Sequence, residues 1–270
     1  MWGRPTMRPT LKHGRILGPT LKCPTLKHGL ILGPALKRGR IFVVMSTAII
    51  IPALNEEASI GRVVQAVRVH ATRVVVVDNG STDATADVAR AAGAIVVHQA
   101  ERGYGAACLR GIEELATDPP EVVVFVDGDF SDHPDDVAEV RAPVLHGDAD
   151  LVIGSRVRGT RERGSLTPQQ VFGNWLATTL IRLRWKVAFT DLGPLRAIRW
   201  TTLMQMDMKD RTYGWTVEMQ IKAARDGVRC MEVPVRYRRR IGQSKVSGTV
   251  KGTIMAGVII LRTIAQYALR

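Results

Sequence analysis

The feature that most restricts the fold is a series of short apolar runs that alternate with amphipathic stretches from Met45 onward. The runs predict strands over residues 47–51, 73–77, 94–98, 122–126 and 150–153. The stretches between them predict helices over 58–69, 83–92, 104–115 and 134–146. Because strands this apolar are buried on both faces, helices must cover both sides of the sheet. The sequence therefore predicts an α/β fold with a doubly wound, mostly parallel sheet.

The alternation becomes less regular after Gly154. The pattern predicts a helix over 168–183, a strand over 194–198, a helix over 215–225 and a strand over 229–235. The tail over 249–270 is apolar but contains Lys251 and Arg262, and its length is marginal for a membrane span. We expect it to form an amphipathic helix that lies at a membrane surface or packs on the domain over 45–248.

Residues 1–44 repeat a short unit that contains Pro and Gly, starting at Pro9, Pro24 and Pro34. Because each unit is interrupted by these residues, we predict disorder rather than a helix or strand. The segment holds nine of the 38 Lys and Arg residues and no Asp or Glu, which leaves 29 basic against 25 acidic residues elsewhere. The segment is either a basic arm that adheres to a membrane or an extension upstream of a natural start at Met45. Because the basic charge is concentrated there, the domain is not predicted to bind nucleic acid.

Polar residues after the strands are the first candidates for a site, because ligands of an open α/β sheet bind at the carboxyl ends of its strands. Asp127 and Asp129 follow the strand predicted over 122–126. Two neighbouring carboxylates repel unless a cation lies between them, and Mg²⁺ or Mn²⁺ shared with a substrate diphosphate is the natural one. The alternative is an ordinary acidic turn in which Ser131 and Asp132 cap the next helix.

Two further strand endings carry acidic residues. Asp78 is placed to accept hydrogen bonds from a nucleobase or ribose, although Asn79 and Gly80 would also build a turn that needs no ligand. Glu56 either lines the same pocket or stabilises a helix N-terminus through the helix dipole.

Taken together, the strand endings resemble those of family 2 glycosyltransferases, which have the GT-A fold. The matching segments are 51–56 (IPALNE), 77–83 (VDNGSTD), 127–129 (DGD) and 154–156 (GSR). Three later segments resemble the branch of dolichol-phosphate mannosyltransferases and polyprenyl-phosphate glycosyltransferases: 191–199 (DLGPLRAIR), 213–220 (YGWTVEMQ) and 233–245 (VPVRYRRRIGQSK). The resemblance implies inverting transfer of a hexose from GDP-mannose or UDP-glucose to a polyprenyl or dolichyl phosphate.

The resemblance also implies roles for single residues. Pro52, Leu54, Glu56 and Asp78 would bind the nucleoside of the donor, and Asp127 and Asp129 would hold the metal and the diphosphate. Ser131 occupies the position of a further metal contact. The catalytic candidates are Asp129, Arg156 and Asp191, and the planar guanidinium of Arg156 suits the donor diphosphate or the acceptor phosphate.

The basic segment over 236–245 is either a phosphate site or an exposed strand edge. Alternation along a strand would turn Arg238 and Arg240 inward, together with Ser244 and Lys245. We assign Arg238 and Lys245 to the donor, and Arg240 and Ser244 to the acceptor phosphate.

The acceptor decides whether a general base is needed. A hydroxyl requires one, whereas an acceptor phosphate is already an anion. Asp191 is the evident base candidate in the second half, and it is equally a candidate partner for Arg196 or Arg199.

Other functions compete with transfer to a lipid phosphate. The acceptor is alternatively soluble, such as a phosphorylated small acid, and a silent basic protein that binds membranes or nucleic acid is a further alternative. The apolar tail and the basic segment favour the lipid acceptor. Three scattered cysteines favour a reducing compartment, so we expect a cytoplasmic enzyme, peripheral at the inner face of the membrane. The sequence predicts no particular oligomeric state.

Overall fold

The computed structural model describes residues 46–242 and 250–269, with the side chains of 250–254 left out. The predictions for residues 1–44, Ser244 and Lys245 lie outside these described residues. The strands are β1 (Thr47–Ala53), β2 (Arg73–Asp78), β3 (Ile95–His98), β4 (Val122–Phe125), β5 (Leu151–Arg161), β6 (Arg196–Arg199) and β7 (Cys230–Tyr237). The α-helices are α1 (Ile60–Val67), α2 (Thr85–Ala91), α3 (Tyr104–Leu115), α4 (Asp136–His146), α5 (Pro168–Trp185), α6 (Trp200–Met206), α7 (Trp215–Arg225) and α8 (Val250–Ala268).

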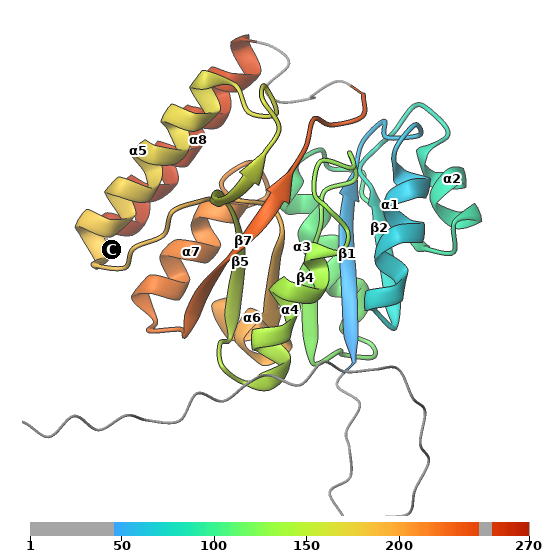
Figure 1. Ribbon diagram of the computed structural model, residues 1–270, viewed down its shortest axis with the longest axis horizontal. Helices are drawn as coiled ribbons and strands as arrows, with labels where there is room; N and C mark the ends of the chain where they lie inside the picture. The colour runs from blue at the N-terminus through green and yellow to red at the C-terminus, as the bar shows by residue number, and fades with distance from the viewer. Residues whose placement is uncertain (1–45, 243–249, 270) are drawn as a thin grey trace, which may run out of the picture. The chain divides into compact units, whose positions relative to one another are not determined.

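The strands form one sheet in the order β3-β2-β1-β4-β6-β5-β7 (Figure 1). Within this described sheet, β6 runs antiparallel to β4 and β5, and the other neighbouring pairs are parallel. The chain moves outward from β1 to β3 and then returns to β4 on the other side of β1. The loops after β1 and β4 therefore diverge at a topological switch point, where a ligand crevice is expected.

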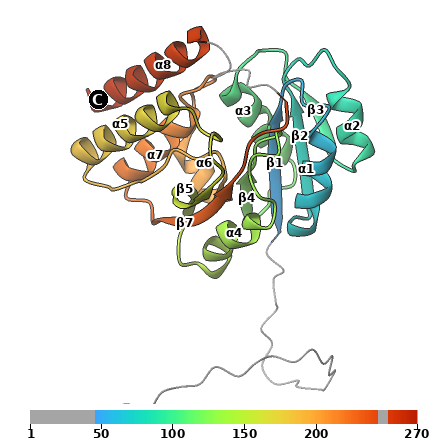
Figure 2. The ribbon, with the colours of Figure 1, turned by 45° about the horizontal axis from the view of Figure 1, so that its top comes forward.

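Alternating apolar side chains bury both faces of the sheet. Ile49 and Val124 face a core completed by α1, α2 and α4. Ile50 and Phe125 face the other core, to which α3, α6 and α7 contribute. The two layers of helices are visible on opposite sides of the strands in Figures 1 and 2. The predicted doubly wound, mostly parallel α/β fold is confirmed.

Helices α5 and α8 lie side by side at one end of the sheet, beyond α7 (Figures 1 and 2). The N-terminus of α5 carries a capping box, in which Thr167 and Gln170 each bind the other's backbone N–H. The hydroxyl of Tyr267 in α8 donates to Glu218 Oε1 of α7 at 2.7 Å, which fastens α8 to the domain. Within the described part of the chain, no helix combines the length and the apolar character that crossing a bilayer requires.

Two elements differ from the prediction. The strand predicted over 150–153 is longer, because β5 continues to Arg161 as the polar residues after Ser155 pair with β7 across an irregularity. The backbones approach closely there: a Cβ on Gly159 would lie 1.9 Å from the carbonyl oxygen of Val235. Helix α6 was not predicted, since its seven residues are too few to show a clear helical period.

Candidate active site

A cavity of about 810 Å³ lies at the carboxyl ends of β1 and β4, where the topology predicts a crevice. One part of its wall is polar and comes from strand endings and loops: Glu56, Asn79, Asp127, Asp129, Arg156 and Arg240. Another part comes from α5 and α8 and is mostly apolar or small: Gly173, Ala256, Gly257, Ile259 and Ile260, next to Leu166 and Leu192. One cavity thus offers groups for a highly charged ligand and groups for an apolar one.

The acidic loop over 127–132 brings buried carboxylates together at the end of β4. Burial raises the pKa of Asp127 to about 7, and the negative charge of Asp129 adds to the shift, while Arg240 and Arg156 oppose it. Asp129 is only 4% exposed, and its Oδ2 lies 3.0 Å from Nη1 of Arg240. Arg240 and Arg156 therefore offset only part of the effect of burial and like charge, so ionisation of Asp127 is unfavourable without a further cation.

The segment that follows β7 holds the acidic loop in place. The backbone N–H groups of Arg238 and Ile241 donate to the carbonyl oxygens of Ser131 and Asp129, at 3.0 and 2.9 Å. Phe130 has a φ of 62°, in the left-handed region that non-glycine residues rarely adopt. The guanidinium of Arg238 stacks on the Phe130 ring, 3.6 Å from its centroid, and its Nε donates to the Phe130 carbonyl. These contacts stabilise an unfavourable backbone turn beside the carboxylates.

The loop also contains polar atoms that lack partners among the described residues. Asp132 is 3% exposed with Oδ1 unpaired, and burial, followed by the charges of Asp127 and Asp129, raises its pKa well above the ordinary value. The hydroxyl of Ser131 is likewise buried and unpaired. Neither residue caps α4, whose N-cap is Asp135, so the alternative interpretation as a capping turn is wrong.

A divalent cation fits the chemistry of this loop. In residues 46–242 and 250–269, no three His, Cys, Asp or Glu side chains are grouped to hold a metal by themselves. Asp127 and Asp129 would therefore need further oxygens, such as those of a diphosphate, to complete a coordination shell. A cation between them would relieve the repulsion that raises the pKa of Asp127.

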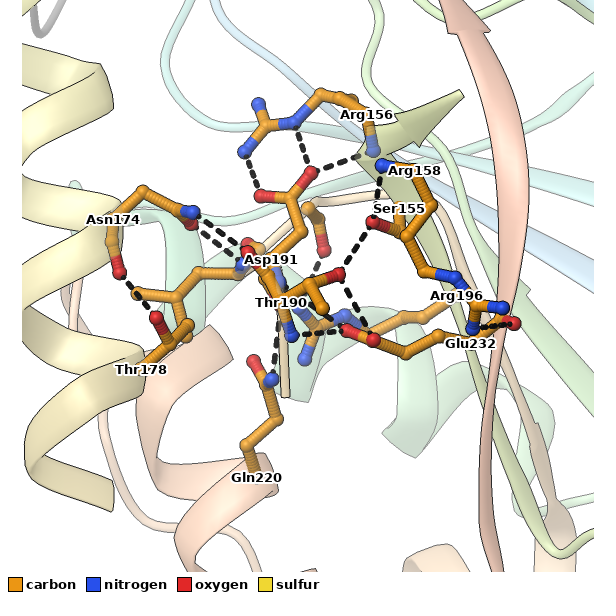
Figure 3. A network of polar contacts seen from close by, with 12 residues as sticks. Ser155, Arg156, Arg158, Asn174, Thr178, Thr190, Asp191, Arg196, Gln220 and Glu232 are labelled. Atoms are coloured by element: carbon orange, nitrogen blue, oxygen red, sulfur yellow. Dashed lines mark hydrogen bonds and ion pairs between the residues drawn. The ribbon is translucent and has the colours of Figure 1, made fainter. Parts of the chain in front are cut away.

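Arg156 enters the cavity wall from β5 and is held by one carboxylate (Figure 3). Its backbone N–H and Nε both donate to Asp191 Oδ2, at 2.7 and 2.8 Å, and its Nη2 donates to Oδ1 at 2.7 Å. The guanidinium also lies 5.0 Å from the centroid of the Tyr237 ring. Burial lowers the pKa of Arg156, but the charge and hydrogen bonds of Asp191 raise it by more. The net effect is a pKa above the ordinary value, so the side chain stays cationic.

The loop that carries Asp191 is fixed by side chains from α5, α7 and β7 (Figure 3). Glu232 accepts hydrogen bonds from the N–H groups of Thr190 and Asp191 and from the Thr190 hydroxyl. Asn174 donates to the Thr190 carbonyl at 3.0 Å and accepts from the N–H of Leu192 at 2.8 Å. Gln220 donates to the Asp191 carbonyl at 3.0 Å. Arg156 is thus positioned by Asp191, and the loop that carries Asp191 is in turn held by Glu232, Asn174 and Gln220.

The partner of Asp191 corrects one alternative from the sequence. Arg196 instead donates to the carbonyl oxygens of Leu192 and Thr216, and burial lowers its pKa to about 10. Arg199 pairs with Asp150 at 3.3 Å. Asp191 orients Arg156, a possibility that sequence spacing did not raise because one residue lies in β5 and the other in the loop before β6.

The structure brings together most, but not all, of the residues predicted for the site. The cavity is lined by Pro52, Leu54, Glu56, Asp127, Asp129, Arg156 and Arg240. Asp78 lies behind that wall, where its Oδ1 accepts from the N–H of Ser81. Ser131 and Asp191 are buried behind Asp129 and Arg156, and Arg238 lies on the Phe130 ring rather than in the cavity wall. The inward orientation expected for Arg238 is not observed, because β7 ends at Tyr237 and strand alternation stops there.

Several residues of the cavity were not predicted. Tyr104 lines it at the start of α3, between two glycines that allow residues 210–212 to approach. A Cβ on Gly105 would lie 2.0 Å from the Asp210 carbonyl, and the Gly105 N–H donates to the Thr212 carbonyl at 3.1 Å. The two glycines around an aromatic residue were the available signal. Asn174 and the α8 residues gave none, because they reach the cavity only through helix packing.

A mostly parallel doubly wound sheet with paired carboxylates and arginines around a cavity at its strand ends defines a glycosyltransferase of the GT-A fold. The chain belongs to glycosyl transferase family 2, whose sequence model matches residues 48–205.

Curated relatives agree with this assignment over almost their whole length. An uncharacterized glycosyltransferase of Mycobacterium tuberculosis is 37% identical over 214 residues, which cover 78% of this chain and 94% of that protein. An undecaprenyl-phosphate mannosyltransferase of Micrococcus luteus is 33% identical over 228 residues, covering 79% of this chain and 93% of that protein.

A solved structure shares the fold. Glucosyl-3-phosphoglycerate synthase of Mycobacterium tuberculosis, in complex with Mn²⁺, UDP and phosphoglyceric acid, superposes with a TM-score of 0.67 at 22% identity. The match covers 83% of this chain and 79% of the other.

Proposed function

We propose that this glycosyltransferase transfers a hexose, with inversion, from GDP-mannose or UDP-glucose to a polyprenyl phosphate. The reaction would depend on Mg²⁺ or Mn²⁺ and take place at the cytoplasmic face of a membrane, with the enzyme bound peripherally. The observation that carries the proposal is the mixed wall of the cavity, which combines charged groups from the strand endings with small and apolar residues of α8, while α5 contributes Gly173 and three amide side chains, Gln169, Gln170 and Asn174. The name of the Micrococcus relative supports the lipid acceptor, and the Mn²⁺ and UDP of the solved structure support the donor class.

The donor half of the cavity would be formed by the loops after β1, β2 and β4. Pro52, Leu54 and Glu56 line the wall that would receive the nucleoside, with Asp78 behind them. Asp127 and Asp129 would hold the divalent cation, whose charge would offset the negative charge that develops on the leaving diphosphate. Arg240, 3.0 Å from Asp129, keeps a further cation beside the same oxygens.

Arg156 would bind phosphate oxygens at the point where donor and acceptor meet. Its bonds to Asp191 use Nε and Nη2, and Nη1 has no hydrogen-bond partner among the described residues. A guanidinium fixed on one edge presents its other edge without a further loss of side-chain entropy. Both oxygens of Asp191 accept hydrogen bonds from Arg156. We therefore assign it a positioning role.

This arrangement suits an acceptor that needs no base. A phosphate monoester is already ionised at neutral pH and would attack the anomeric carbon directly, with departure of the nucleoside diphosphate on the opposite face. The acceptor phosphate would lie against Arg156 and Arg240, while its hydrocarbon chain would contact the α5 and α8 part of the wall.

The proposal is tested by incubating the full chain with Mg²⁺ or Mn²⁺, labelled GDP-mannose or UDP-glucose, and a polyprenyl phosphate, and by counting label in the organic phase. We expect one donor to label the lipid only when the metal is present. Label confined to water, in a product formed with a phosphorylated small acid, would replace the proposal with the soluble-acceptor function. Labelled donor that is transferred neither to the lipid nor to a phosphorylated small acid would contradict both functions.

A further inference from the structure

Exposed apolar side chains are concentrated on α5 and α8. Thirteen large hydrophobic residues are exposed in the described part of the chain, and eight of them belong to α5, α8 or the residue that follows α8. They are Val171, Phe172, Trp175, Leu183, Met255, Val258, Leu261 and Leu269. Most of the positions are separated by three, four or eight residues, spacings that keep side chains on one side of a helix, so each helix presents an apolar stripe to solvent.

The most exposed part of the α5 stripe is an aromatic pair. Phe172 and Trp175 are 60% and 58% exposed, and their ring centroids lie 5.8 Å apart. Single exposed apolar residues are common on soluble proteins, but a contiguous aromatic pair beside a ligand cavity indicates an interaction surface. Trp and Phe on one side of a helix are typical of segments that lie in the membrane interface.

The charge on these helices indicates the kind of partner. Neither 168–185 nor 250–268 contains a single Asp or Glu. Arg182, Lys186 and Arg262 are exposed beside the stripes. Apolar stripes flanked by cations, without carboxylates, complement the anionic headgroups of a phospholipid bilayer.

The other sides of the same two helices line the cavity. Gly173 of α5 and Gly257 of α8 both belong to its wall, and a Cβ added to either would meet no heavy atom within 4 Å. The packed pair α5 and α8 therefore leaves space in the cavity wall that also contains Ala256 and Ile260. A lipid in a bilayer that contacts the stripes would therefore reach the cavity without passing through water.

We propose that the outer stripes of α5 and α8, with Arg182, Lys186 and Arg262, bind an anionic phospholipid bilayer, and that Phe172 and Trp175 insert into its interface. The acceptor would then enter the cavity between α5 and α8 from the bilayer. This second statement rests on the proposed transfer to a lipid phosphate, whereas the bilayer surface names the residues behind the proposed peripheral binding and does not depend on the reaction.

The test compares three variants of the full chain in co-sedimentation with vesicles of phosphatidylcholine, with or without phosphatidylglycerol. The variant F172Q/W175Q removes the aromatic pair, and M204Q removes an exposed apolar side chain of α6, which is 40% exposed. We expect the wild type and M204Q to bind the anionic vesicles equally. F172Q/W175Q should bind at least about tenfold more weakly, as two exposed aromatic side chains lose their interfacial contacts. R182Q should weaken binding about fivefold, and only to vesicles that contain phosphatidylglycerol.

Residues 1–44 carry nine basic residues and are present in every variant, so vesicle binding alone does not support the proposal. Equal binding of F172Q/W175Q and the wild type would overturn it. Sedimentation velocity without lipid covers another occupant of the same surface: a dimer that F172Q/W175Q dissociates, with no vesicle binding by the wild type, would show that a second copy covers the stripes.

Transfer assays separate this inference from the proposed function. With a short-chain polyprenyl phosphate in detergent solution, F172Q/W175Q should transfer sugar at the wild-type rate, since neither residue lines the cavity. With a long-chain acceptor embedded in anionic vesicles, its rate should fall about tenfold, in parallel with binding. A wild type that labels lipid while binding no vesicles would refute the bilayer surface and leave the function intact. Vesicle binding that F172Q/W175Q abolishes, without any lipid labelling by the wild type, would refute the proposed transfer reaction and leave the bilayer surface intact.

Discussion

Two loops beside the cavity bury aspartates under opposite conditions. In the acidic loop over 127–132, Asp127 lies beside Asp129, and the pKa of Asp127 is raised to about 7 by burial and by its neighbour's charge. In the loop before β6, Asp191 is 1% exposed yet accepts three hydrogen bonds from Arg156. In the first loop, the carboxyl of Asp127 is hard to ionise because burial and like charge are only partly offset, whereas in the second the carboxylate of Asp191 is paired directly with one guanidinium.

The difference shows that burial alone does not define the role of a carboxylate. A buried carboxylate with few donors around it favours binding of a cation, while one that is saturated by donors positions the group that saturates it. The acidic loop thus has the chemistry of a binding site, and Asp191 that of a support. The following predictions test this distinction, from the largest expected effect to the smallest.

Asp129→Asn should have the largest effect, because it removes a charge from the acidic loop and leaves Arg240 without its partner. We expect kcat/KM for sugar transfer to fall by about a thousandfold, as the leaving diphosphate loses its electrostatic stabilisation. The transfer assay measures this loss, and calorimetry should show that the metal-dependent part of nucleotide binding disappears.

The matched control is Asp87→Asn, which changes an aspartate on α2 whose side chain is 84% exposed. It should keep the wild-type rate. A variant at Asp129 that retains more than about a tenth of the activity would contradict the role of the acidic loop.

Asp191→Asn should lower the rate by about a hundredfold, because Arg156 loses its carboxylate partner and one of the two acceptor oxygens that fix its orientation. Arg156→Lys should cause a similar loss, since a lysine cannot make the same paired contact. If Asp191 acts only through Arg156, the double variant should be no slower than either single variant.

A general base would give a different result. Losses that multiply in the double variant, together with removal of the acidic limb of the pH–rate profile in Asp191→Asn, would show that Asp191 accepts a proton from the acceptor. That outcome would place a hydroxyl, rather than a phosphate, in the acceptor site.

Much of the fold and of the acidic site was predictable because the strands are unusually uniform. β1, β2 and β4 are apolar runs whose carboxyl ends carry Glu56, Asp78 and Asp127, so topology alone places these residues near one another. The bounds of α3 and α7 agree with the predicted ranges because each combines a regular apolar period with clear ends.

The rest of the site depends on contacts that leave no local pattern. The polar residues after Ser155 form a strand only because β7 pairs with them, and Arg156 meets Asp191 across 35 residues of chain. Gly257 and Ile260 are ordinary residues of an apolar tail until α8 packs beside α5. Strand alternation predicted that Arg238 points into the site, but its guanidinium stacks on the ring of Phe130 instead.

Glu232→Gln should have a smaller effect on the rate, because Glu232 contacts neither Arg156 nor the cavity wall and acts on Asp191 through the backbone. A glutamine keeps one acceptor oxygen but replaces the other with a donor that faces the Thr190 hydroxyl. We expect a loss of about tenfold in kcat with little change in KM.

The control for this variant is Glu113→Gln, on a side chain of α3 that is 68% exposed, which should leave both constants unchanged. Unchanged kinetics in Glu232→Gln would show that the loop over 189–193 keeps its shape without this carboxylate.

The smallest expected effect is a gain in stability that depends on pH. The pKa of Asp127 rises from an ordinary 3.8 to about 7 on folding, so between these values the folded state binds more protons than the unfolded state. The free energy of unfolding therefore falls as the pH rises through this window, by linkage. Asparagine does not titrate, so Asp127→Asn should match the wild type at pH near 4 and exceed it in Tm by a margin that grows as the pH rises toward 7.

Thermal unfolding in the presence of a chelator, followed from acidic to mildly alkaline pH, measures the difference between Asp127→Asn and the wild type. Addition of Mn²⁺ should then stabilise the wild type above neutral pH and leave the variant unchanged, because only the wild type gains a partner for its excess charge. A Tm difference that does not vary with pH would mean that Asp127 is as well balanced as Asp191, and the contrast between the two loops would fail.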